Sequence, residues 1–258
     1  MSLMGLIARK SRSDATAFSL PHVFAERALS ELSGREGGRI NPFLVQKFCD
    51  HLVTGDGGAA DAYVDTLREL GLGTERLLTG YIPAAADALG IGWVEDRITF
   101  SQVTAAMGAL MAVTRQVMPP PRSPAGRRPP RILLSRAPGE EHVLGLLLAS
   151  HALRQQGWLV NMDLSGDLYH LRAKVLAEDV DIVGFGITCP ERLNGLQAAI
   201  KVVRNSSKVR IVVGGGLVAA ADDKFGADLA IPRHADIAMT LSEEFGLELI
   251  PTAATGDP

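Results

Sequence analysis

The segment 131–145 reads Arg131-Ile-Leu-Leu-Ser-Arg-Ala-Pro-Gly-Glu-Glu-His-Val-Leu-Gly145. The first four residues are typical of a short buried parallel strand. The Pro-Gly pair is typical of a turn, and the residues after the histidine are typical of a helix with an apolar face. His142 is therefore predicted on a loop between a strand and a helix. In open α/β sheets such loops lie at the carboxyl ends of the strands, where ligands bind.

The polar residues of this loop suggest a metal ligand. Glu140 and Glu141 precede His142, and Gly145 follows it. A carboxylate beside an imidazole orients the ring and raises its basicity, as it does for metal-ligating histidines. A glycine lets another backbone or a flat ligand approach closely. Taken alone, these residues fit a solvated loop histidine that has no role better than a metal ligand.

Strand and helix patterns alternate through the rest of the chain. Strands are expected over residues 131–135, 158–163, 181–187, 209–213 and 228–231, and helices over 141–156, 167–177, 190–204, 217–225 and 234–245. This alternation predicts an α/β domain in which helices cover both faces of a five-stranded parallel sheet. The ends of the first, third and fourth strands are expected to converge on one edge of the sheet.

The preceding region has a helical pattern. Helices are expected from about Phe43, over 61–70, over 75–89 after a cap at Thr74, and from a cap at Thr99 or Ser101 to Met118, with turns at 55–58, 71–73 and 90–92. Helices with such short connections predict a small four-helix bundle. The expected order is an arm (1–38), the bundle (39–118), a proline-rich linker (119–130), the α/β domain (131–250) and a tail (251–258).

Composition restricts the classes of function. The chain has 258 residues, 47% hydrophobic and 21% charged, with a net charge of −3, which argues against chain-wide attraction to nucleic acid. No uninterrupted apolar run reaches about 20 residues, and the first 20 residues lack a signal-peptide core. We therefore expect a cytoplasmic protein without a membrane contact. Cys49 and Cys189 match no metal or disulfide spacing and are expected as buried free thiols.

The motif Glu140-x-His142-x-x-Gly145 resembles the Asp-x-His-x-x-Gly signature of cobalamin-binding domains. The segment 181–188 is similar to the third strand of that family, and 212–216 to the strand that ends in its Gly-Gly pair. The resemblance implies a Rossmann-like (flavodoxin-like) domain that binds adenosyl-, methyl- or hydroxocobalamin. It makes His142 the lower axial ligand of cobalt. The residues expected around the cofactor are Glu140, which orients the imidazole, Glu141, Gly145, Gly186 or Thr188 in place of the family's serine, and Gly214, Gly215 and Gly216 along the nucleotide tail.

The predicted bundle resembles the cap that covers the upper face of the corrin in methionine synthase and in CarH-type repressors. Trp93 corresponds to the cap tryptophan, although a tryptophan at a helix end is otherwise a common core anchor. Val103 and Thr104 stand where the photoreceptor repressors have Glu-His. These three residues complete the expected cofactor-contacting set.

A bundle joined to a cobalamin-type domain, with no DNA-reading module recognised before it, is most similar to the AerR/PpaA antirepressors. The resemblance implies a light- or redox-responsive transcriptional regulator, not an enzyme, that contacts a PpsR/CrtJ-type repressor of photosynthesis genes. Arg9, Lys10 and Arg12 allow a weak DNA contact. Two alternatives stay open, namely a corrinoid methyl carrier that serves a separate methyltransferase, and a sensor that binds haem through His142.

Overall fold

The computed structural model describes residues 40–55, 57–69, 71–120, 128–219, 224–232 and 235–246. The expected arm (1–38), the tail (251–258) and the linker residues 121–127 lie outside the described residues. The chain divides into two compact units between Met118 and Pro119.

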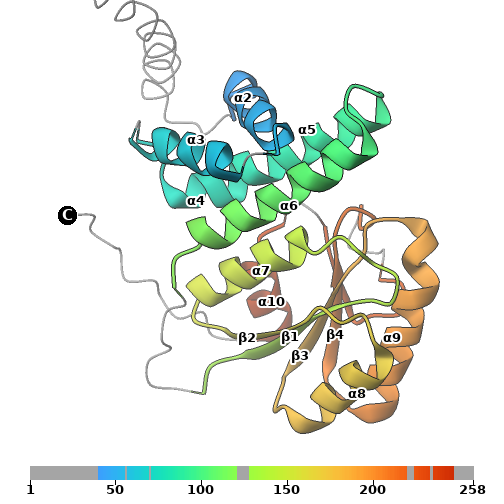
Figure 1. Ribbon diagram of the computed structural model, residues 1–258. Helices are drawn as coiled ribbons and strands as arrows, with labels where there is room; N and C mark the ends of the chain where they lie inside the picture. The colour runs from blue at the N-terminus through green and yellow to red at the C-terminus, as the bar shows by residue number, and fades with distance from the viewer. Residues whose placement is uncertain are drawn as a thin grey trace, which may run out of the picture. The chain divides into compact units, whose positions relative to one another are not determined.

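The first unit consists of helices (Figure 1). Their bounds are α2 Pro42–Val53, α3 Gly57–Glu69, α4 Thr74–Arg76, η2 Leu77–Tyr81, α5 Ile82–Val94 and α6 Phe100–Val117. The side chain of Asn41 caps α2, and Thr99 and Gln102 form a reciprocal capping box at the start of α6. Apolar side chains of α2, α5 and α6 meet in the core, including the fully buried Phe48, Leu52, Ile82 and Leu110.

Two predicted boundaries in this unit are wrong. The helical path is unbroken from Thr74 to Val94 through α4, η2 and α5, so residues 90–92 form no turn. A glycine inside a helix costs only about 1 kcal/mol relative to alanine, and burial of Leu89 on this helix offsets such a cost. The chain turns later, at Asp96, whose φ is 55°. Thr74 is the first helical residue and Gly73 occupies the N-cap position.

The helical stretch 74–94 is long and apolar enough to cross a membrane when judged by length and composition. The stretch contains Glu75, Arg76 and Asp87, so it is not an uninterrupted apolar run. Core helices of water-exposed proteins pass the same test, and Leu77, Tyr81 and Ile82 are fully buried in the helical unit. The packing therefore accounts for the apolar character of this helix.

The second unit is an α/β domain, as predicted. Its strands are β1 Arg131–Arg136, β2 Leu159–Asp163, β3 Ile182–Gly186, β4 Arg210–Gly214 and β5 Leu229–Ile231. Its helices are α7 Leu144–Gln155, α8 Leu168–Ala177, η3 Pro190–Arg192, α9 Leu193–Ser206 and α10 Ile237–Phe245. All strand pairs are parallel, and the strand order is β2-β1-β3-β4-β5. This is the flavodoxin-like order.

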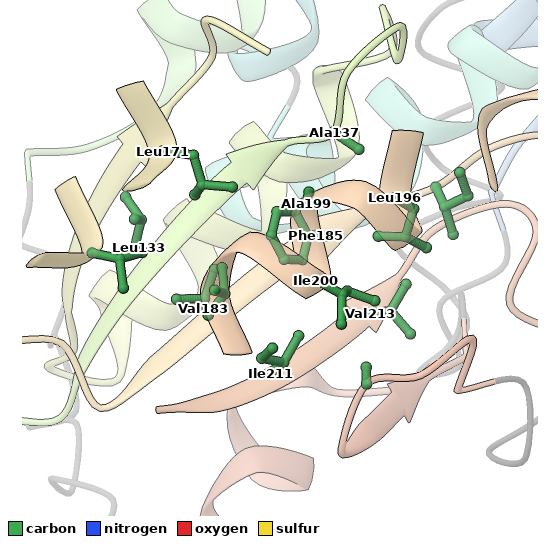
Figure 2. Packing of buried hydrophobic residues seen from close by; sticks show 14 of the residues in the cluster. Leu133, Ala137, Leu171, Val183, Phe185, Leu196, Ala199, Ile200, Ile211 and Val213 are labelled. Carbon is green, nitrogen blue, oxygen red and sulfur yellow. The ribbon is translucent and has the colours of Figure 1, made fainter. Parts of the chain in front are cut away.

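Two apolar layers hold the helices to the sheet. On one face, α8 and α9 pack on Leu133, Val183 and Phe185 (Figure 2). On the other face, α7 and α10 pack on the intervening strand residues, such as Ile132, Leu134 and Ile182. Successive side chains of a strand point to opposite faces, so strands that are covered on both sides read as continuous apolar runs.

The helix expected over 217–225 is wrong for the residues of that range that the structure describes, 217–219 and 224–225, which have no helical conformation. Backbone N–H groups of this segment instead donate hydrogen bonds to a loop and within a turn. Leu217 N–H donates to the Ile187 carbonyl and Val218 N–H donates to Gly215. Val218 is buried in the layer beneath α9, so this segment closes the core directly after β4.

Candidate functional site

The strand order places a topological switch point at the carboxyl ends of β1 and β3. From β1 the chain crosses to β2 on one side, and the next crossover places β3 on the other side. Loops leave such a switch point in opposite directions, and ligands of open α/β sheets bind there. Arg136 pairs in register with Gly186, which pairs with Gly214. The predicted site residues of β1, β3 and β4 therefore share this edge of the sheet.

Glu140 is the centre of the site. Its carboxylate is completely buried. Oε1 accepts the backbone N–H groups of Glu141 and His142, both at 3.0 Å, and lies 2.7 Å from Nδ1 of His142. Oε2 accepts the N–H of Thr188 at 3.0 Å and its hydroxyl at 2.7 Å. Because every donor points at one side chain, Glu140 fixes the loop after β1 to the loop after β3.

Of the two ring nitrogens of His142, Nδ1 is hydrogen-bonded and Nε2 has no partner among the described residues. Its side chain is 66% exposed. A carboxylate can only accept at this position, so Nδ1 carries the proton and Nε2 keeps its lone pair. This is the tautomer and the orientation that a metal-ligating histidine needs.

The pKa values of the pair shift in opposite directions. Burial would raise the pKa of Glu140, but the hydrogen bonds from His142 and Thr188 outweigh it and lower the pKa to about 2. The hydrogen bond to Glu140 raises the pKa of His142, against the opposing effects of burial and of Arg192. Glu140 is therefore ionised at neutral pH and gives the imidazole anionic support.

Thr188 belongs to the site, with a partner that sequence reasoning did not expect. The sequence offered Gly186 or Thr188 in place of the family's serine at the nucleotide tail. Thr188 Oγ1 lies 2.7 Å from Glu140 Oε2 and 3.0 Å from His142 Nδ1. The feature of the sequence that indicates this role is a hydroxyl-bearing residue directly after a buried strand. The pairing across 48 residues depends on the strand order.

The predicted glycines differ in the space that surrounds an added Cβ atom. An added Cβ at Gly145, on the exposed first turn of α7, would meet no protein atom within 4 Å. At Gly186 it would touch Leu146 at 3.4 Å. Gly215 has φ +118°, and a Cβ there would collide with the carbonyl oxygen of Ile187. The fold itself thus requires Gly215, whereas the open space beside Gly145 is available to a ligand.

Gly214 and Gly216 flank this tight position. A Cβ would lie 3.4 Å from the Ile231 carbonyl oxygen at Gly214 and 3.6 Å from that of Thr188 at Gly216, which are ordinary contacts. Both residues lie at the carboxyl end of β4, beside the end of β3. Glu141 is exposed and joins the site through its backbone N–H.

The expected cap residues lie in the helical unit. Trp93 is 48% exposed, so it is no core anchor, and its ring lies 6.2 Å from that of the exposed Phe100. The Thr104 hydroxyl donates to the Phe100 carbonyl within α6, and Val103 is half-buried. Ile91 and Val94 are also exposed on the same helix end.

The donor set of the α/β unit fits a cobalt macrocycle. Among the described residues no group of three or more His, Cys, Asp or Glu side chains could hold a bare ion. A corrin would supply its own ring nitrogens, so that the protein would hold the metal by a single side chain. His142 would be that side chain, through Nε2 and backed by a buried carboxylate.

Three comparisons relate this chain to known proteins. The family model described as B12 binding domain matches residues 130–241. An "Uncharacterized 20.5 kDa protein in bchF-crtJ intergenic region" of Rhodobacter capsulatus is 29% identical over 190 residues, which span 71% of this chain and 97% of that protein. The monomethylamine corrinoid protein of Methanosarcina barkeri shares the fold, with a TM-score of 0.60, 15% identity, and coverage of 80% of this chain and 100% of that chain. Residues 130–241 are therefore similar to the B12-binding domain family.

Proposed function

We propose that this protein is a cobalamin-binding, light- or redox-responsive antirepressor that acts by contact with a PpsR/CrtJ-type repressor of photosynthesis genes. The observation that carries cobalamin binding is the open Nε2 of His142, with Nδ1 held by the buried Glu140. The regulatory output is supported by the Rhodobacter capsulatus relative, whose name places its gene between bchF and crtJ.

Each residue of the site has a defined task in this proposal. His142 binds cobalt from below, Glu140 holds the imidazole in the required tautomer, and Thr188 holds Glu140. The open space beside Gly145 leaves room for the flat cofactor. When bound, cobalamin supplies an upper cobalt bond that light or a change of redox state can alter. A switch requires that the ligand interact differently with two states of the protein.

The first experiment is the absorption spectrum of the protein purified from cells that received both cobalamin and haem. A corrin spectrum that changes on illumination supports the sensor. A Soret band that is lost in His142→Ala would assign the site to haem. A light-stable corrin that accepts methyl groups would make the protein a methyl carrier, which the domain family also accommodates.

The second experiment tests the ligand itself. His142→Ala is expected to lose the imidazole–cobalt spectrum, and Glu140→Gln to weaken cobalamin binding by about 10–100-fold, the usual effect of removing a partner of a metal ligand. Glu141→Gln is the matched control, because the Glu141 side chain is exposed and only its backbone contacts the site. Equal affinities for Glu140→Gln and Glu141→Gln would remove Glu140 from the site.

The third experiment tests the output. A PpsR/CrtJ-type repressor is mixed with the cobalamin-loaded protein in the dark and after illumination, and the complex is measured by size-exclusion chromatography. The proposal requires that the amount of complex differ between the two conditions and that this difference vanish in His142→Ala. Cytoplasmic localisation and a role in binding without catalysis are parts of the same proposal.

A further inference from the structure

A second carboxylate–imidazole pair lies at the carboxyl end of the neighbouring strand β2. Asp163 ends β2 and is 2% exposed. Its Oδ1 lies 3.0 Å from Nδ1 of His170, in the first turn of α8. Ser165 bridges the pair, because its hydroxyl donates to Oδ1 at 2.7 Å and lies 3.2 Å from Nδ1. The sequence alone did not indicate that these residues form a ligand site.

This arrangement repeats the chemistry of the first site. In both places a buried carboxylate and a hydroxyl contact Nδ1 of a histidine on a loop or helix start after a strand. The side chain of His170 is 52% exposed. Its Nε2 has no hydrogen-bond partner among the described residues. Like His142, it presents a lone pair to solvent with its proton fixed on Nδ1.

The second pair differs in one informative respect. Both oxygens of Glu140 are fully hydrogen-bonded, whereas the buried Oδ2 of Asp163 has no hydrogen-bond partner among the described residues. A buried carboxylate with an unpaired oxygen is costly. A positive charge bound at Nε2, on the side of the imidazole away from Asp163, would offset that cost. Opposite charges attract strongly over short distances inside a protein. A metal centre bound at Nε2 of His170 would supply such a charge.

We propose that His170 is a second axial-ligand site, which takes a metal macrocycle with an open coordination position, such as haem or a corrinoid without a nucleotide tail. One imidazole suits a macrocycle better than a bare ion, because the ring supplies the other ligands and the described residues offer no cluster of three donors. Leu164 and Tyr169, 37% and 81% exposed, add apolar surface to the same loop and helix turn.

The second site is independent of the first. His170 lies on α8, which packs on one face of the sheet, whereas α7, which follows His142, packs on the other face. The loops that carry the two histidines follow different strands, β2 and β1. Loss of either imidazole therefore leaves the other pair intact.

The test uses the full chain and two probes, Fe(III) protoporphyrin IX and aquocobinamide, titrated into His142→Ala and into the double variant His142→Ala/His170→Ala. We expect an imidazole-ligated spectrum with at least one probe in His142→Ala and its loss in the double variant. The probe that binds identifies the class of macrocycle. Absence of such a spectrum in His142→Ala, or its persistence in the double variant, overturns the proposal.

Two further variants separate ligation from folding. Asp163→Asn is expected to weaken probe binding in the His142→Ala background by about 10–100-fold. Asp167→Asn is the matched control, because Asp167 accepts the backbone N–H of His170 and does not contact its ring. The single variants His170→Ala and Asp163→Asn should still bind cobalamin as the unaltered protein does. If Asp163→Asn and Asp167→Asn weaken the probes equally, the pair has no role in ligation.

Discussion

The hydroxyl of Thr188, in the loop after β3, donates to Oε2 of Glu140, in the loop after β1, over 2.7 Å. The backbone N–H of Thr188 donates to the same oxygen. These two hydrogen bonds join loops that are 48 residues apart in the chain. The position of the His142 imidazole therefore depends on β3 as well as on its own loop.

Replacement of Thr188 tests this dependence. In Thr188→Val the hydroxyl donor is lost while the shape is kept, so Glu140 Oε2 retains only the backbone N–H. A buried acceptor that loses a donor costs about 1–3 kcal/mol. We expect a loss of that size in the free energy of unfolding, measured by urea denaturation, together with weaker cobalamin binding. Thr188→Ser keeps the hydroxyl and should retain most of both, and equal behaviour of the two variants would contradict the role of Thr188.

Acid should destabilise the α/β unit through Glu140. The pKa of Glu140 is about 2 in the folded protein, against an ordinary 4.5. The carboxylate therefore contributes stability that is present above pH 4.5 and is lost as the pH falls toward 2, in total about 3 kcal/mol. Glu140→Gln should be less stable than the unaltered protein at pH 6, and the difference should shrink on acidification. A difference that is independent of pH would show that Glu140 does not titrate as described.

Gly145 should show opposite effects on stability and on binding. Because an added Cβ meets no protein atom and the residue lies in α7, Gly145→Ala should stabilise the protein by about 0.5–1 kcal/mol. The larger Gly145→Leu should fold but bind cobalamin more weakly, because its side chain occupies the space assigned to the cofactor. Thermal denaturation and spectroscopic titration measure the two effects. Unchanged cobalamin affinity in Gly145→Leu would place the cofactor elsewhere.

Gly215 should be required for folding and not for ligand contact. Gly215→Ala combines a strained φ of +118° with a collision against the Ile187 carbonyl, so a loss above about 1 kcal/mol is expected in the free energy of unfolding. Gly226→Ala is the control, with φ +97° and open space around the added Cβ. The excess loss in Gly215→Ala over Gly226→Ala measures the collision. Equal losses would mean that the two segments can separate without cost.

Local sequence predicted much of this protein. The alternation of apolar runs predicted the parallel sheet. The sequence also offered Thr99 or Ser101 as the cap of α6, and the structure shows Thr99, because capping depends on neighbouring residues. The motif around His142 predicted the B12-binding domain, which the family match confirms. The helix expected over 217–225 failed in its described residues because Val218 and the backbone of Leu217 are used in long-range packing.

Patterns within short segments were enough to predict the fold class and to propose His142 as the histidine that binds cobalt. The hydrogen bond of Thr188 to Glu140, the close approach of Ile187 to Gly215 and the pairing of Asp163 with His170 are visible in the folded protein alone. Each of these contacts depends on strand order, on side-chain direction or on which atoms are left without a partner. Those properties appear when distant segments pack together and share donors and acceptors.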